Sequence, residues 1–293
     1  MRNVILLAGA TVALTAAMAV PALANGYCHS GDPIVQNANN SLSSGTHNAE
    51  QDIYQGVDGA VGQVAHYESW DFLHWFPTKS TIQKQDASNT KSSSGGGHQT
   101  IIQGQVGYLW SECGPAQNQK AENFSKNGNG NSQKAKQFQF GIIVHGEAKG
   151  TAQDQSAKNS TDNGSSGNTQ KTKQKQFLFS LFGTEGTVQS QSAQNKVNSG
   201  NDNYQSTSQS QSLFVGYADG GNHGATQEQT ATNNVSGGSG NEQSIKQSES
   251  LAAKSPDGTV QSQTATNDVS GGNDNEQSIT QVQHTVLLSG NSY

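Results

Sequence analysis

This 293-residue chain contains unusually little apolar bulk and little charge. Only 30% of its residues are hydrophobic and 13% are charged, whereas globular domains average about 45–50% and about 25%. Glycine (34 residues) and glutamine (34 residues) take their place, together with Ser, Asn and Thr. We find no catalytic motif and no paired carboxylates in an apolar setting. The composition therefore argues against an enzyme with an ordinary hydrophobic core, and we expect neither enzymatic activity nor a cofactor.

Arginine is almost absent, since Arg2 is the only one in the chain. Bidentate recognition of phosphate and guanine depends on arginine. The formal net charge is −6, which adds no electrostatic attraction to a polyanionic nucleic acid. A nucleic-acid partner is therefore disfavoured.

The N-terminus has the pattern of a secretory signal peptide over residues 1–24. Arg2 precedes an apolar stretch over residues 5–20, and Ala22-Leu23-Ala24 is a small-x-small cleavage site. The rival interpretation is an uncleaved anchor, but the apolar stretch is short for one. No later segment is apolar enough to cross a membrane as a helix. We expect a protein that is secreted or held at the cell surface.

Cysteine is scarce, with Cys28 and Cys113 as the only two. An exported chain meets oxidising conditions, so these two cysteines are expected to form one disulfide. Neither has a histidine at zinc-ligand spacing. We therefore expect no metal site.

Internal repetition is the strongest positive signal. The pattern Gln-x-Ala-x-Asn occurs seven times, and its last six copies recur at intervals of 34, 36, 36, 38 and 34 residues. The first copy begins at Gln36, and another Gln stands two residues before each later copy. In those six copies the Gln and Asn pairs are Gln85/Asn89, Gln119/Asn123, Gln155/Asn159, Gln191/Asn195, Gln229/Asn233 and Gln263/Asn267.

A second pattern, Gln-x-x-x-Gln, follows each copy after 14 or 15 residues. A third Gln follows two residues later in five of the copies. The first copy of the second pattern is Gln51/Gln55. The other pairs are Gln99/Gln103, Gln133/Gln137, Gln170/Gln174, Gln205/Gln209, Gln243/Gln247 and Gln277/Gln281.

Both patterns have the period of two that is typical of β-strands. The repeated Gln, Ala and Asn fall on one face, while the other face accepts any residue, such as Lys84, Asp154 or Ser190 at one equivalent position. A constant face and a variable face indicate an inside and an outside. Buried amides need hydrogen-bond partners, and stacked identical rungs supply them at the strand spacing of about 4.8 Å. The sequence therefore predicts an all-β fold, a β-solenoid of strand–turn–strand units stacked parallel and in register, with inward Gln/Asn ladders.

Glycine-rich turns separate the two strands of each unit, as at Asn163-Gly164 and Gly271-Gly272. The predicted organisation is a signal peptide (1–24), an N-terminal segment with the first repeat (25–66), an aromatic insertion (67–82) and six repeats of about 36 residues (83–293). The second strand of most units ends in apolar residues. They form either a hydrophobic core at one end of the stack or a surface for lateral association.

Two features are candidate partner contacts. The aromatic insertion carries Trp70, Phe72, Trp75 and Phe76, and it is either a terminal cap, which repeat arrays need, or a docking element. Nine lysines against four acidic residues lie between positions 120 and 175. They are either a solvated face or a basic band for an acidic polysaccharide or a neighbouring subunit. The lysines chosen as contacts are Lys134, Lys136, Lys171, Lys173 and Lys175.

The repeat region, residues 34–289, resembles the curlin-type functional amyloids of bacterial surfaces. They too are exported, rich in Gly, Asn, Gln and Ser, and built from strand–turn–strand repeats with stacked inward amides, although motif order and repeat length differ here. The resemblance implies an extracellular structural protein, a self-associating subunit of a fibre, surface layer or biofilm matrix. The alternative is a soluble solenoid adhesin that binds a polysaccharide or a surface. The last repeat lacks a charged or proline-rich cap, which favours head-to-tail assembly.

Overall fold

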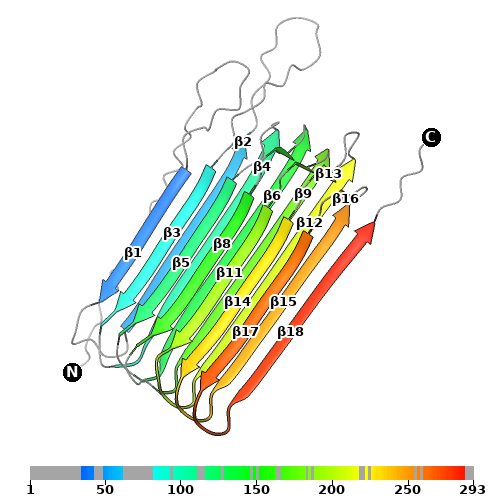
Figure 1. Cartoon of the computed structure of the whole chain (residues 1–293). Coiled ribbons are helices and arrows are strands. Elements are labelled where there is room, and N and C mark those ends of the chain that lie inside the picture. The colour runs from blue at the N-terminus through cyan, green and yellow to red at the C-terminus, as the bar shows by residue number, and fades with distance from the viewer. Residues whose placement is uncertain are drawn as a thin grey trace, which may run out of the picture.

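The computed structural model shows an all-β protein built from two long parallel sheets that lie face to face (Figure 1). It describes residues 34–42, 49–61, 82–92, 95–110, 116–126, 129–145, 148–149, 152–162, 166–182, 184–185, 188–217, 222–223, 226–253, 256–257 and 260–287. Each repeat contributes one strand to each long sheet. The predicted β-solenoid of stacked strand–turn–strand units is confirmed.

The first sheet contains the Gln-x-Ala-x-Asn strands in chain order, all parallel. Its seven strands are β1 (Ile34–Leu42), β3 (Ile82–Lys91), β5 (Ala116–Ser125), β8 (Ala152–Thr161), β11 (Val188–Val197), β14 (Thr226–Ser236) and β17 (Val260–Ser270).

The second sheet contains the Gln-x-x-x-Gln strands, also in chain order and parallel. Its seven strands are β2 (Ala49–Val61), β4 (Gly97–Trp110), β6 (Asn131–His145), β9 (Thr169–Phe182), β12 (Tyr204–Tyr217), β15 (Glu242–Ala253) and β18 (Glu276–Leu287).

A third, narrow sheet closes four of the repeats, between the second-sheet strand of one unit and the first-sheet strand of the next. Its four strands have two residues each and stack parallel in chain order. They are β7 (Ala148–Lys149), β10 (Thr184–Glu185), β13 (Asn222–His223) and β16 (Pro256–Asp257).

The strand register places each repeated residue on its equivalent in the next unit. Gln191 pairs with Gln155 on one side and with Gln229 on the other, and Ala193 and Asn195 behave likewise. The second sheet keeps the same like-on-like register. Parallel in-register stacking, which the repeated amides require, is therefore the observed arrangement.

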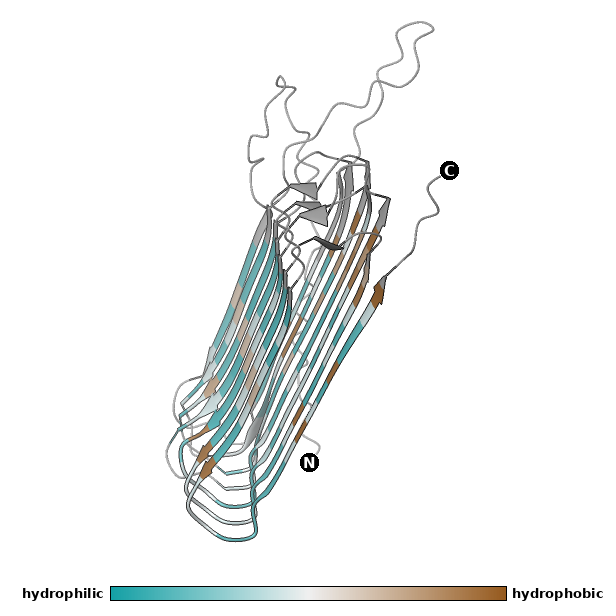
Figure 2. Cartoon of the chain, turned by 45° about the vertical axis from the view of Figure 1, so that its right-hand side comes forward, coloured by the Kyte–Doolittle hydropathy of each residue, from teal (hydrophilic) through white to brown (hydrophobic). Residues whose placement is uncertain are grey.

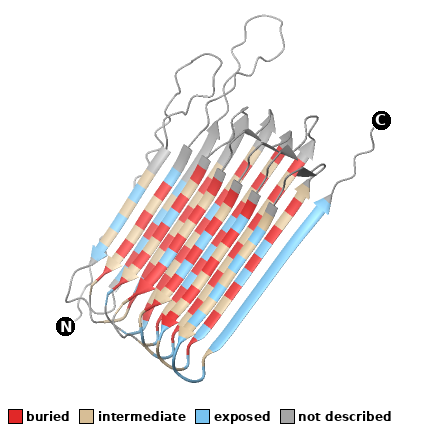
Figure 3. Ribbon diagram, in the orientation of Figure 1, coloured by how far each residue is buried: buried red, intermediate tan, exposed pale blue. Residues whose placement is uncertain are grey.

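In the strands that lie between the two ends of the stack, burial alternates, and every second residue is enclosed between the sheets (Figure 3). The enclosed positions are mostly Gln, Asn and Ala, so the strands are predominantly hydrophilic in Figure 2. A small apolar cluster lies at the N-terminal part of the stack, where Ile53 and Ile101 meet Ala87 and Ala121. The interior is therefore narrow and held mainly by polar contacts.

The apolar strand ends of the second sheet divide between its two faces. Leu178, Leu213 and Leu251 point inward and are at most 2% exposed. Phenylalanines lie at the alternating outward positions, where Phe140 stacks on Phe177 with ring centroids 5.2 Å apart. Strand alternation thus places the leucines in the interior, as the core prediction requires, and the phenylalanines on the outer face. Lateral association through that face stays a prediction.

Glycines at the turns allow the rungs to approach closely. Gly238 and Gly272 have φ of +100° and +89°. A Cβ on Gly238 would lie 2.0 Å from the Gly200 carbonyl oxygen, and one on Gly272 would lie 1.8 Å from the Gly238 carbonyl oxygen. These positions therefore need glycine for both conformation and space.

Candidate functional site: amide ladders and an open terminal rung

The repeated glutamines form continuous columns of side-chain hydrogen bonds along the stack. In the Gln36, Gln51 and Gln55 columns, each named for its first member, every Nε2 donates to the Oε1 one rung nearer the N-terminus. The donor–acceptor distances are 2.7–3.1 Å. A Gln117 column adds the glutamines that precede each motif. The predicted glutamine ladders are confirmed.

The second amide hydrogen of each interior glutamine ties one sheet to the other. Gln191 Nε2, on β11, donates to the backbone oxygen of Ser210 on β12 at 3.2 Å. Gln209 Nε2, on β12, donates back to Thr230 O on β14 at 3.0 Å. Glutamine therefore binds both along the stack and across it, a role that the repeat pattern alone does not reveal.

The prediction for Gln103 and Gln137 was incomplete, because it gave them partners only within their ladder. Gln137 Nε2 donates to Gln103 Oε1 at 2.8 Å, as the ladder requires, but also to Ser156 O on β8 at 3.0 Å. Gln103 Nε2 donates to Gln55 Oε1 at 2.8 Å and also lies 3.0 Å from two backbone oxygens of the facing sheet, Gln85 O and Lys120 O. These extra contacts arise because the facing strands are staggered, so that backbone oxygens of the first sheet lie opposite each amide.

The asparagine column of the first sheet has the opposite polarity. Asn123 Nδ2 donates to Asn159 Oδ1, which lies one rung nearer the C-terminus, at 2.9 Å, and the column continues to Asn267. Glutamine and asparagine columns therefore run in opposite directions within one sheet. Thr172 also joins this network, because its Oγ1 donates to Asn195 Oδ1 at 3.0 Å.

Asn89 departs from the predicted ladder, because only its amide nitrogen is hydrogen-bonded, with Gln51 O and Thr100 O among its acceptors. It is 0% exposed, and its Nδ2 donates to Asn123 Oδ1 at 3.0 Å. Its buried Oδ1, however, has no hydrogen-bond partner among the described residues. The reason is that Asn40, one rung nearer the N-terminus, donates its amide to Asp52 O instead. The side-chain column therefore begins at Asn89 and does not extend to the first rung.

A second asparagine column at the turns was missed from the sequence. Asn131 Nδ2 donates to Asn168 Oδ1 at 3.1 Å, and the backbone N–H of Asn131 donates to the same atom. The column continues through Asn203 and Asn241 to Asn275. An Asn two residues before the first Gln of the second pattern was the available signal, and it recurs in five copies.

The ladder residues of the last repeat are not interior, contrary to the prediction. Gln263 and Asn267 are half-buried, and Gln277 and Gln281 are exposed. Strand β18 is exposed along its length (Figure 3). Ile279 is 47% exposed, whereas Ile245, which pairs with it from the rung nearer the N-terminus, is 0% exposed. The reason is that no described strand stacks beyond β17 and β18.

The two ends of the stack have complementary hydrogen-bonding groups. Within the described residues, the side-chain oxygens of Gln263 and Gln277 accept no hydrogen bond. At the first rung Gln36 donates only to Gly56 O and Gln51 only to Thr90 O, so each keeps one free amide hydrogen among these residues. In the same two columns, the C-terminal end of the stack therefore presents free oxygens, and the N-terminal end presents free amide hydrogens.

One rung interrupts a ladder. The Gln105 column runs through Gln139, Gln176 and Gln211 and then meets Glu249, which is 0% exposed. Burial raises the pKa of the Glu249 carboxyl to about 7, the Glu228 carboxylate adds to this rise, and a hydrogen bond from Gln283 opposes it. Gln283 Nε2 donates to Glu249 Oε2 at 2.9 Å.

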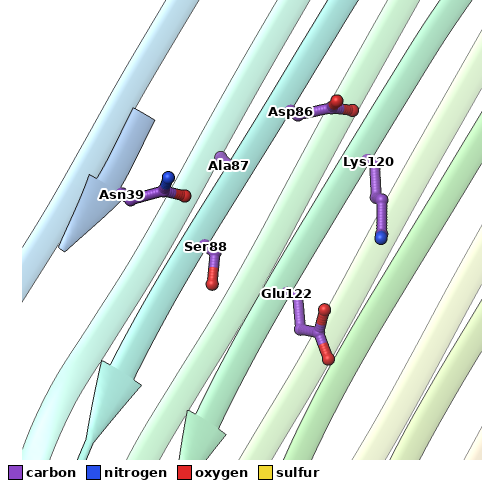
Figure 4. Close-up of a pocket in the computed structure, with 6 residues that line it drawn as sticks. All are labelled: Asn39, Asp86, Ala87, Ser88, Lys120 and Glu122. Carbon is purple, nitrogen blue, oxygen red and sulfur yellow. The ribbon is translucent and has the colours of Figure 1, made fainter. Parts of the chain in front are cut away.

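The outer faces of the two long sheets differ in charge pattern. On the first sheet, a lysine and an acid stand at neighbouring outward positions of β3 and of β5, and Lys84 pairs with Asp86 at 3.2 Å. A shallow hollow there is lined by Asn39, Asp86, Ala87, Ser88, Lys120 and Glu122 (Figure 4). On the second sheet, the predicted contact lysines of β6 and β9 all lie on the outer face. These are Lys134, Lys136, Lys171, Lys173 and Lys175.

Other predicted features lie outside the described residues. These are the signal peptide, the paired cysteines Cys28 and Cys113, and the insertion residues Trp70, Phe72, Trp75 and Phe76. Their roles stay predictions. In the described ranges, no three His, Cys, Asp or Glu side chains gather to hold a metal ion, and no helix has the length and hydropathy to cross a membrane.

The fold and its interior define a class of protein, a parallel β-solenoid with Gln/Asn ladders. No protein-family model, curated protein or solved structure matches the chain.

Proposed function

We propose that this protein is an extracellular structural subunit that assembles head to tail into a fibre, surface layer or biofilm matrix. The observation that carries the proposal is the complementarity of the two ends. A second copy whose first rung continues the stack would place Gln36 on Gln263 and Gln51 on Gln277. In both columns a free amide hydrogen would then meet a free oxygen.

The asparagine column supports the same junction, although its hydrogen bonds run in the opposite direction to those of the glutamine columns. Asn233 Nδ2 donates to both Ser244 O and Asn267 Oδ1, whereas Asn267 Nδ2 donates only to Ser278 O among the described residues. Its remaining hydrogen would reach Asn40 of the incoming copy. Ile279 would pack under Ile53, as it packs on Ile245 within the chain. Because such a contact does not close on itself, it yields filaments.

Electron microscopy and light scattering of the mature protein test this proposal. Gln277→Lys with Gln281→Lys places two charges on the inner side of β18 and should abolish fibres, because buried unpaired charges are costly. Ser278→Lys with Thr280→Lys adds the same charge to the outer side of the same strand and should leave assembly intact. Deleting residues 260–293 should still permit fibres, because β14 and β15 then present equivalent glutamines.

Thermal unfolding of each variant separates lost assembly from lost folding. If the intact mature protein stays monomeric at high concentration and shows no fibres, assembly is refuted. The soluble adhesin that binds a polysaccharide or a surface then becomes the leading function.

A further inference from the structure

The outer face of β6 and β9 carries a compact array of lysines, here called the lysine grid. Lys134 lies beside Lys171 and Lys136 beside Lys173 in the strand register, and Lys175 lies beside Phe138. Neighbouring strands are about 4.8 Å apart and alternate residues about 6.6 Å apart along a strand. Five positive charges therefore occupy a patch two strands wide.

The grid has no acidic neighbour on either flanking strand. The outward residues beside it are Thr100, Ile102 and Gly104 on β4 and Ser206, Ser208 and Ser210 on β12. Asp52 on β2 and Glu242 on β15 are the closest outward acids of this sheet, each two strands away. The charge of the grid is therefore not neutralised by its own sheet.

Mutual repulsion within the grid lowers the pKa of one of its lysines. The Lys134 ammonium is the main cause of a lowered pKa at Lys136, with smaller contributions from burial and from a hydrogen bond between the two. Lysines on the first sheet differ, since Lys84 contacts Asp86 and Lys158 lies 3.9 Å from Glu122. An anion laid on the grid would relieve repulsion that the fold leaves uncompensated.

Aromatic side chains border the grid along the strands. Phe140 and Phe177 stack on one another, as do Phe179 and Phe214 at 4.8 Å. Each of these rings has one face covered by its stacking partner, which reduces the open aromatic surface on which single-strand binding proteins stack nucleobases. Phe138, beside Lys175, is 43% exposed, so single-stranded DNA is the competing ligand in the test. Lysine also binds as a point charge without the bidentate fork of arginine.

We propose that the lysine grid binds an extended acidic polysaccharide, held by its carboxylates across β6 and β9. An array on the outer face of a sheet suits a long polymer better than a small ligand, because small-molecule sites are concave. The grid is on a lateral face, away from both ends of the stack. Polymer binding and head-to-tail assembly therefore use different surfaces.

Binding of the mature protein to polygalacturonate, with neutral dextran and single-stranded DNA as comparisons, tests the grid. The triple variant Lys134→Ser, Lys171→Ser, Lys173→Ser should lose at least about tenfold in affinity for polygalacturonate, equal to about 1.4 kcal/mol. The next rung already carries Ser206 and Ser208 at the equivalent positions, so the fold tolerates serine there. High salt should weaken wild-type binding.

A charge-matched control uses the first sheet. Lys84→Ser, Lys120→Ser, Lys158→Ser removes the same charge from the opposite outer face and should change the affinity less than about twofold. Equal losses in the two triple variants, or tighter binding to DNA than to polygalacturonate, would overturn the proposal. Protection of Lys171 and Lys173 from acetylation by the bound polymer, read by mass spectrometry, gives a second measurement.

Discussion

Glu249 lies one rung beyond Gln211 in the Gln105 column, and each residue leaves a buried side-chain oxygen, Oε1, without a hydrogen-bond partner among the described residues. Elsewhere in the glutamine columns, the amide of the later rung donates to the oxygen of the earlier rung. A carboxylate has no hydrogen to donate, so two acceptors meet at this step. A protonated Glu249 would donate its O–H to Gln211 and complete the ladder.

We expect the stability of the fold to depend on protonation of Glu249. Its pKa rises from 4.5 to about 7 on folding, chiefly because of burial. The folded protein thus binds the extra proton, and this stabilisation is full below pH 4.5 and is lost as the pH rises through about 7. The difference is on the order of 3 kcal/mol.

The variant Glu249→Gln tests this by chemical unfolding across that pH range. The introduced amide should donate to Gln211, raise the stability at pH 8 and flatten the dependence on pH. Glu242→Gln, an exposed change on the same strand, should leave the pH profile as in the wild type. A Glu249→Gln profile that parallels the wild type would show that this carboxyl does not control stability.

Ladder glutamines should matter far more than outward residues beside them. Gln209 donates to Gln174 and to Thr230 O and accepts from Gln247. Gln209→Leu leaves these groups without partners, at about 1–3 kcal/mol for each buried group. Ser208→Leu, on the outer side of the same strand, should cost less than about 1 kcal/mol.

Thermal unfolding of the two single variants tests whether the amide ladders stabilise the interior. Equal shifts in Tm for Gln209→Leu and Ser208→Leu would mean that the ladders do not hold the sheets together.

Close stacking of the turns predicts a steric effect at Gly238. Gly238→Ala would force a Cβ against the Gly200 carbonyl oxygen at 2.0 Å and would hold alanine at φ +100°. We expect a loss of at least about 2 kcal/mol. Gly104→Ala is the matched control, because nothing lies within 4 Å of its added Cβ. Unfolding in urea measures both, and a neutral Gly238→Ala would contradict the observed spacing of the rungs.

Much of the interior was predictable because the repeat places Gln, Ala and Asn at alternate positions in every unit. Period two assigns them to one face, and buried amides leave in-register stacking as the arrangement that satisfies them. The partner of the second amide hydrogen, as at Gln103 and Gln137, was not predictable, since it is a backbone oxygen whose position depends on how the sheets face each other. The unpaired oxygen of Asn89 was equally unpredictable, because it depends on which acceptor the Asn40 amide chooses, and that acceptor is Asp52 O. The Asn131 column escaped notice because its residues lie where the glycine-rich turn meets the second strand, ahead of the Gln-x-x-x-Gln pattern.

The sequence by itself determined the class of fold, the register and the identity of the interior residues, because each repeat carries the same local pattern. Only the tertiary structure decided which end of the stack presents acceptors and which presents amide hydrogens, and that the buried carboxyl of Glu249 leaves Gln211 Oε1 without a partner among the described residues. These relations join residues that lie about one repeat apart in the chain. Their chemistry arises only when stacking brings successive rungs to the hydrogen-bonding distance of neighbouring strands.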